Sequence, residues 1–199
     1  MFAAILDTNV LWPSLQRDFL LSMAIEGLYR PLWSEAILDE LHLHEQLKLV
    51  DRGSEPAAAL ASADRLVARM RTSFGDALVT GWKPLDGSFN LPDPDDEHVV
   101  AAAVAGGAGA IVTDNTKHFP PARVPAHIQV LSGKEFAENT ADVDPERAAR
   151  ALCEMSRRRT RTSQSPRELV DLLMVRYQMD AVAVAVLPLI DEIAASYEL

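Results

Sequence analysis

The feature that most constrains this chain is a short apolar run at its start that ends abruptly in polar residues. Residues 1–6 read MFAAIL, and Asp7, Thr8 and Asn9 follow at once. An unbroken apolar run of this length is typical of a strand that is buried on both faces, as in parallel sheets. Because ligands bind beyond the carboxyl ends of such strands, we expect Asp7 to lie at a functional edge of a sheet.

Further apolar runs alternate with segments of helical periodicity. This alternation predicts an α/β fold with three layers, in which a central, mostly parallel sheet is flanked by helices. Pro31 indicates that one of the strands lies near an edge of the sheet or that the proline lies at a strand end. Strands are expected at residues 28–33, 77–80, 110–113 and 128–131, and helices at 17–26, 34–50, 56–71 and 95–105.

From residue 133 onward the pattern is only helical. The chain of 199 residues is long enough for one core of ordinary size and a helical appendage. We therefore predict an α/β domain over residues 1–132 and a C-terminal helical module over 133–199. Helices in the module are expected at 145–156, 166–174 and 181–195.

Composition excludes several classes of protein. With 29 acidic and 19 basic residues the net charge is −10, which argues against simple, sequence-independent binding to polyanions. An acidic protein that acts on nucleic acid needs cations or a local basic patch to mediate contact. The single cysteine, Cys153, precludes an internal disulfide and predicts a reducing, cytoplasmic location. No signal peptide is expected, and the apolar run at 181–190 is about half of the ~20 residues that a membrane span needs.

Several acids are predicted to meet at one place. Asp114 follows the apolar segment 110–113 as Asp7 follows its strand, so both are expected at one sheet edge. On a helix over 95–105, Asp96 falls in the middle of the apolar stripe, whereas His98 points away. Glu40 falls on the inner face of the helix at 34–50, between Ile37 and Leu47.

Each of these acids also has an ordinary structural explanation. An Asp after a strand is often a turn former, an Asp in a first helical turn is favoured by the helix dipole, and Glu40 would be a surface residue if its helix frayed. The coincidence of four such acids favours a functional site. The histidines at 42, 44, 98 and 127 lack the spacing of a metal site and are expected to be solvated.

Carboxylates that cluster without basic partners repel one another, and a hard divalent cation relieves that repulsion. Only Lys117 is close in sequence to any of these acids. Mg²⁺ or Mn²⁺ at such a site can deprotonate a water molecule and stabilise the oxygen that leaves a phosphodiester. The acids therefore predict hydrolysis of a nucleic-acid backbone.

Four segments carry a resemblance to the PIN-domain nucleases, and they occur in that family's order over residues 1–132. They are LDTNVL at 6–11, SEAILDEL at 34–41, DPDDEHVVAAA at 93–103 and IVTDNTKHFP at 111–120. The resemblance implies a PIN-like fold and a Mg²⁺- or Mn²⁺-dependent endoribonuclease.

The resemblance also implies roles for individual residues. Asn115 stands where many relatives have Asp, so either Asp114 or Asn115 is expected to reach the metal. The implied catalytic and metal-binding acids are Asp7, Glu40, Asp96 and Asp114, and the supporting residues are Thr8, Asn9, Asp93, Thr113 and Asn115.

The chain also resembles the VapC-type toxins of toxin–antitoxin pairs, here with an extra C-terminal helical module. That resemblance implies an RNA substrate, a small antitoxin protein that inhibits the enzyme, and a homodimer as one candidate assembly. A basic cluster within the module, formed by Arg157, Arg158, Arg159 and Arg161, is a candidate contact for RNA phosphates or for an acidic partner segment. A solvated loop is the alternative interpretation of that cluster.

Three other functions compete with the ribonuclease. A haloacid-dehalogenase-like phosphatase would use Asp7 as a nucleophile, but it needs a second acid at the position of Asn9. A flap-endonuclease-like DNA nuclease needs more chain than this for its helical arch. A catalytically silent PIN scaffold that acts only in binding is disfavoured by the retention of four acids.

Overall fold

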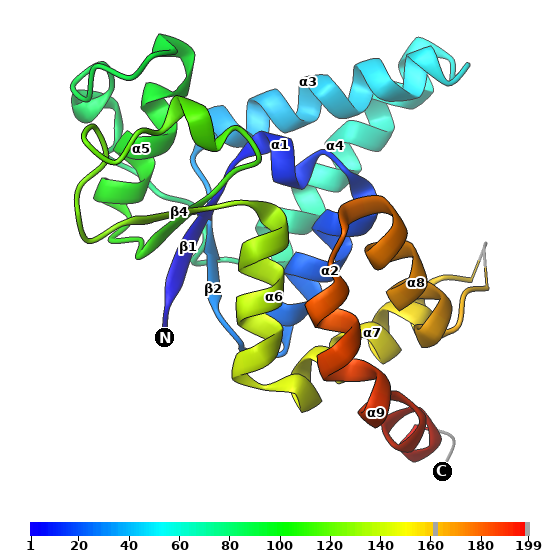
Figure 1. Cartoon of the computed structure of the whole chain (residues 1–199). Coiled ribbons are helices and arrows are strands. Elements are labelled where there is room, and N and C mark those ends of the chain that lie inside the picture. Colours follow the sequence, from blue (N-terminus) through cyan, green and yellow to red (C-terminus); the bar gives the residue numbers. More distant parts are fainter. Residues whose placement is uncertain (161–162, 198–199) are drawn as a thin grey trace. The chain divides into compact units, whose positions relative to one another are not determined.

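A four-stranded parallel sheet forms the centre of the α/β part of the molecule (Figure 1). The computed structural model describes residues 1–160 and 163–197. The strand order is β2-β1-β3-β4, so β1 is central and β2, with its proline, lies at an edge as expected. The strands are β1 (Ala3–Leu6), β2 (Arg30–Leu32), β3 (Ala110–Val112) and β4 (Gln129–Leu131).

The register of β1 and β3 sets the geometry of the site. Ala4 pairs with Ala110 and Leu6 pairs with Val112, and every residue of both strands is buried. The fifth expected strand, at residues 77–80, is reduced to a single parallel bridge between Trp33 and Leu78. The prediction of a parallel α/β sheet flanked by helices is confirmed.

Helices and short 3-10 turns connect the strands of this sheet. Ser34 caps α3 through a hydrogen bond from the Ile37 N–H to its hydroxyl, as a serine before an apolar periodic segment predicts. α5 packs against β1 and β3, and α4 packs against α3. The helices are α1 (Thr8–Leu11), α3 (Glu35–Asp51), α4 (Pro56–Ser73) and α5 (Glu97–Ala105), and the 3-10 turns are η1 (Lys83–Leu85), η2 (Pro94–Asp96) and η3 (Thr116–His118).

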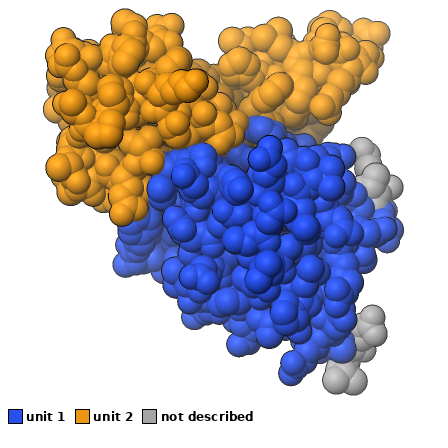
Figure 2. Space-filling view, viewed as in Figure 1, with its two compact units in different colours: residues 1–2, 13–30, 131–199 blue, residues 3–12, 31–130 orange. Residues whose placement is uncertain are grey.

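The chain divides by its contacts into two compact units, which Figure 2 colours separately. One unit comprises residues 3–12 and 31–130 and contains most of the sheet. The other, here called the helical unit, comprises residues 1–2, 13–30 and 131–199. Helix α2 (Ser14–Ile25) therefore groups with the C-terminal helices rather than with its neighbours in sequence. An independent domain at 1–132 remains a prediction.

The helical unit contains one more C-terminal helix than we predicted. Its first C-terminal helix, α6, begins after a capping box in which Ser132 and Glu135 bond each other's backbone N–H groups. The helices are α6 (Gly133–Val143), α7 (Pro145–Arg158), α8 (Pro166–Tyr177) and α9 (Asp180–Ser196). Among the described helices, none is both long enough and apolar enough to cross a membrane.

Candidate metal-binding site

Asp7 is held at the carboxyl end of β1 by three neighbours. Its backbone N–H donates to the Val112 carbonyl at 3.0 Å, which extends the β1–β3 ladder by one step and brings Thr113 opposite it. Its Oδ1 accepts the Thr8 N–H at 2.6 Å, and its Oδ2 accepts the Thr113 hydroxyl at 2.7 Å and the Asn9 amide at 2.6 Å. The roles predicted for these three residues in orienting a carboxylate fit this network.

Ionisation of the Asp7 carboxyl group is unfavourable in this site. Burial raises its pKa to about 6, and the negative charges of Asp96 and Glu40 add to that effect, whereas the hydrogen bonds from Thr113 and Thr8 oppose it. A buried carboxyl group beside two other acids binds a proton or a cation more readily than an exposed one does.

Glu40 projects from α3 toward the same place and is fixed through both of its oxygens. The Thr8 hydroxyl donates to Oε2 at 2.6 Å, and Nε2 of His98 lies 3.0 Å from Oε1. Burial opposes ionisation of Glu40, but these two contacts outweigh it and lower its pKa. Asp39 is exposed, in agreement with the expected helix phase at this turn, although Leu47 is exposed rather than inward.

The expectation that His98 is solvated and points away from the acids is wrong. The α-helix begins at Glu97, after the 3-10 turn η2, and every residue from Glu97 to Ala103 is buried, His98 included. Burial favours the neutral ring, but the bond to Glu40 reverses that preference and raises the pKa of His98. Glu97 is also buried, and its carboxylate accepts hydrogen bonds from the N–H groups of Phe89 and Leu91, which offset the cost of that burial.

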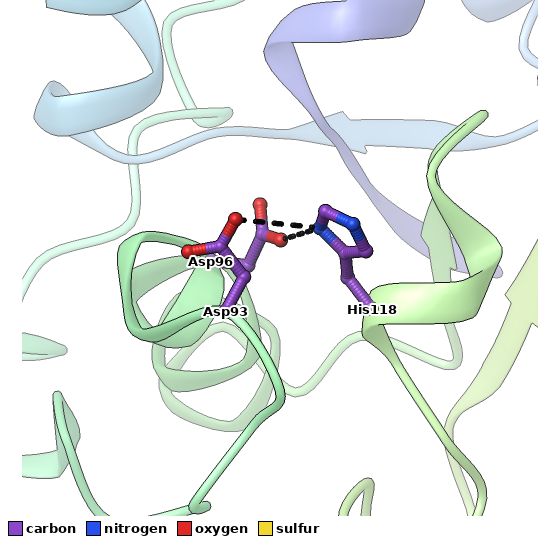
Figure 3. Close-up of side chains that lie close together, drawn as sticks. All are labelled: Asp93, Asp96 and His118. Atoms are coloured by element: carbon purple, nitrogen blue, oxygen red, sulfur yellow. Dashed lines mark hydrogen bonds and ion pairs between the residues drawn. The ribbon is translucent and has the colours of Figure 1, made fainter.

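Asp96 meets a second histidine that the sequence reasoning did not identify. Nδ1 of His118, from η3, lies 2.6 Å from Oδ2 of Asp96 and 3.6 Å from Oδ2 of Asp93 (Figure 3). Burial raises the pKa of Asp96, and the nearby Asp93 adds to this, while His118 opposes it. One ligand atom from each of the three residues lies within 4.8 Å of the others, which is close enough for a shared cation. The only sequence signal was that His118 lies within the fourth motif segment.

One pocket of about 320 Å³ collects three of the four predicted acids, Asp7, Glu40 and Asp96. Among the residues that the structure describes, no lysine or arginine lines it. The strand register brings Thr113 opposite Asp7, and Asp114 is exposed one residue further along, with its N–H bonded to Oδ1 of Asn9. Of the uncertain pair it is Asn115 that lines the pocket. The lining residues are Asp7, Thr8, Asn9, Trp12, Glu40, His44, Asp96 and Asn115.

Comparison with protein families agrees with this arrangement. The family model described as PIN domain matches residues 3–117, which is more than half of the chain. The chain belongs to the PIN domain family. Neither a search of curated proteins nor a search of solved structures found a match. The family expected from the four sequence segments is thus confirmed, and the finer likeness to VapC-type toxins stays a prediction.

The donor set of this PIN protein fits a hard divalent cation. Three carboxylates and two amides line a single pocket, and carboxylate and amide oxygens are the ligands that Mg²⁺ and Mn²⁺ prefer. Threonine, asparagine and histidine side chains orient the carboxylates of Asp7 and Glu40, as partners around a metal site commonly do. The pocket lining offers no fixed positive charge that would take the place of a cation.

The predicted arginine cluster lies in the helical unit and is engaged within it. Arg157 contacts Glu154 at 3.0 Å, and its guanidinium lies 4.9 Å from the ring centroid of Tyr197. Arg159 pairs with Asp18 of α2 at 3.0 Å. Arg158 donates to the Ser22 hydroxyl at 2.7 Å and lies 3.5 Å from the same aspartate, and Arg161 falls outside the described residues.

Proposed function

We propose that this PIN protein is a Mg²⁺- or Mn²⁺-dependent endoribonuclease that hydrolyses RNA phosphodiester bonds. The observation that carries the proposal is the convergence of Asp7, Glu40 and Asp96 on one pocket in which no lysine or arginine of the described chain is a lining residue. An anionic phosphodiester would be repelled by these acids unless a cation lay between them. The PIN family match supports a nuclease rather than a phosphatase.

Each residue of the site has a defined part in this proposal. Asp7, Glu40 and Asp96 would hold the ion, with Asn115 as a further oxygen donor. When bound, the ion would lower the pKa of a water molecule and provide positive charge that stabilises the phosphate oxygens. Thr113 and Asn9 keep the Asp7 carboxylate in place, and the two contacts of Glu40 fix its orientation.

The proposal is tested by cleavage of a labelled single-stranded RNA. Cleavage is expected with Mg²⁺ or Mn²⁺, and none with EDTA. Asp7→Asn keeps the size of the side chain and removes its charge, so it is expected to abolish cleavage, while Asp39→Asn on the exposed face of α3 serves as the matched control. Undiminished cleavage in EDTA, or by the Asp7 variant, would refute the mechanism. A DNA strand of the same sequence tests the preference for RNA.

We further propose that the enzyme is a toxin of a type II toxin–antitoxin pair, that a small antitoxin protein inhibits it, and that it works in the cytoplasm. Support comes from the resemblance of the motif segments and from the single buried cysteine. A small upstream reading frame that encodes a DNA-binding protein is expected. Co-expression of that protein should relieve the growth arrest that the enzyme causes in its host cell. The protein should also co-purify with the enzyme. Sizing of the purified chain tests the homodimer.

A further inference from the structure

Trp12 differs from the other two tryptophans of the chain in its surroundings. Trp33 and Trp82 are buried, whereas Trp12 is 43% exposed and lines the acidic pocket together with Asp7 and Glu40. It caps the single turn of α1 that begins directly after Asp7. The ring of Trp12 therefore offers an apolar face to a ligand in this pocket, and a ligand that covers it removes apolar surface from water.

The indole ring of Trp12 is held in one orientation. Its Nε1 donates to the His44 carbonyl at 3.3 Å, and the His44 ring meets it edge-on at 6.4 Å and 61°. The Lys48 ammonium lies 5.8 Å from the ring centroid and donates to the Trp12 carbonyl at 3.4 Å. A ring that is already fixed loses little conformational entropy when a partner stacks on it.

We propose that Trp12 is the stacking platform for an unpaired base of the nucleic-acid substrate, next to the phosphate that is cleaved. This inference rests on the proposed nuclease function and adds a residue that binds the substrate base. Bases of single strands stack on aromatic side chains with little regard to sequence, since every base has a π-face. A base inside a duplex is covered by its neighbours and cannot reach the ring.

Tryptophan fluorescence reports this contact selectively. Because Trp33 and Trp82 are buried, quenching by an oligonucleotide is expected to come from Trp12. The probes are a short oligouridylate, the same backbone with abasic riboses, and a duplex of equal length. Stopped-flow mixing, with Mg²⁺ and with EDTA, records binding before cleavage. Rapid quenching by the oligouridylate is expected, and the abasic strand and the duplex should leave the fluorescence unchanged.

Variants separate stacking from a structural role of the ring. Trp12→Leu is expected to raise the KM for RNA on the order of tenfold, with a smaller effect on kcat, because a stacked base contributes mainly to binding. Trp12→Phe keeps an aromatic face and should restore most of the affinity. Leu47→Ala, which removes a 55% exposed apolar side chain from α3, is the matched control and should leave KM unchanged.

The outcomes distinguish the two proposals. Cleavage with an unchanged KM in Trp12→Leu, or quenching that does not depend on the base, would overturn the stacking role and leave the nuclease function standing. Base-dependent quenching without cleavage would keep the stacking site and refute the nuclease. If Trp12→Leu fails to fold, the stacking role is still tested on the unaltered protein, by comparing the fluorescence quenching that the intact and the abasic strands cause. Absence of both binding and cleavage overturns both proposals.

Discussion

His98, on α5, holds Glu40, on α3, at 3.0 Å, although the two residues are 58 positions apart in the sequence. His98 is buried and its other ring nitrogen, Nδ1, is also buried and has no hydrogen-bond partner among the described residues. The bond to Glu40 is therefore the main polar contact of this ring. Through this bond, α5, which begins next to Asp96, orients Glu40 on α3.

The first prediction concerns this contact. His98→Leu removes the partner of Glu40 Oε1, so Mn²⁺ affinity is expected to fall by about 10-fold or more, as is usual when a partner of a metal ligand is lost. His98→Gln retains a donor group and should recover part of the affinity. Calorimetric titration with Mn²⁺ measures both variants. Equal, unchanged affinities would show that His98 is only a packing residue.

A second prediction separates the two neighbouring acids of α3. Glu40→Gln should reduce cleavage by about 100-fold or more, because it removes one of three converging carboxylates. Asp39→Asn is exposed and should change the rate by less than about twofold. Rates on the same labelled RNA provide the comparison, and similar losses in the two variants would contradict the inward placement of Glu40.

A third prediction uses the raised pKa of Asp7 in metal-free protein. Since its pKa in the folded state, about 6, exceeds the ordinary value of 3.8, ionisation above pH 6 destabilises the fold, by about 3 kcal/mol. This cost disappears as the pH falls through 6 toward 4. In EDTA at pH 8, Asp7→Asn should raise the melting temperature despite disturbing one hydrogen bond worth about 1 kcal/mol.

The control for this prediction is the same pair of melting curves at pH 4. At pH 4 the higher melting temperature of Asp7→Asn should vanish, because the protonated carboxyl group of the unaltered protein is then uncharged, as the amide is. Added Mg²⁺ at pH 8 should stabilise the unaltered protein and not the variant. A variant that is less stable at both pH values would contradict the electrostatic explanation.

A fourth prediction resolves the position after β3. Both residues are exposed, but Asn115 lines the pocket and Asp114 does not, so Asn115→Ala should reduce cleavage more than Asp114→Ala does. The difference is expected to be about tenfold, the lower range for a residue that supports a metal ligand. A larger loss in the Asp114 variant would mean that its carboxylate swings into the site when RNA or metal binds.

A fifth prediction concerns the arginines of the helical unit. Asp18→Asn removes the carboxylate that Arg158 and Arg159 share, and it should destabilise the protein by about 1 kcal/mol, near the upper range for an exposed pair. Arg157→Gln should cost only a few tenths, since its side chain is 58% exposed. Urea unfolding measures both. A loss of RNA or antitoxin binding in Arg157→Gln, without a loss of stability, would support a contact role for the cluster.

Much of the α/β architecture and the family were predictable from local sequence. The apolar run before Asp7, the serine that caps α3, and the proline that confines β2 to an edge each act within a few residues. Such signals are readable because the backbone geometry and burial of a residue are reflected in the types of the residues next to it in the sequence. The missed helix α6 also had a local signal in its capping box.

The partners within the site depended on register and on contacts between distant elements. Counting residues after each strand suggested Asp114 as the partner of Asp7, but the β1–β3 ladder places Thr113 there, and a shift of one residue sends a side chain to the opposite face. The 3-10 turn before α5 likewise changed the helix phase and buried His98.

The sequence by itself determined which acids this protein has, that Asp7 follows a strand and that Glu40 lies on the inner side of its helix, because those properties repeat with the local period of the backbone. Asp96, which was expected within a helix, lies in the 3-10 turn before α5. Only the tertiary structure decided which groups orient these acids: His98 for Glu40, His118 for Asp96, and Thr113 for Asp7. The reason is physical, since burial and hydrogen bonding of a polar group are set by elements that approach it from elsewhere in the chain. The exposure of Trp12 beside these acids is a property of the same kind.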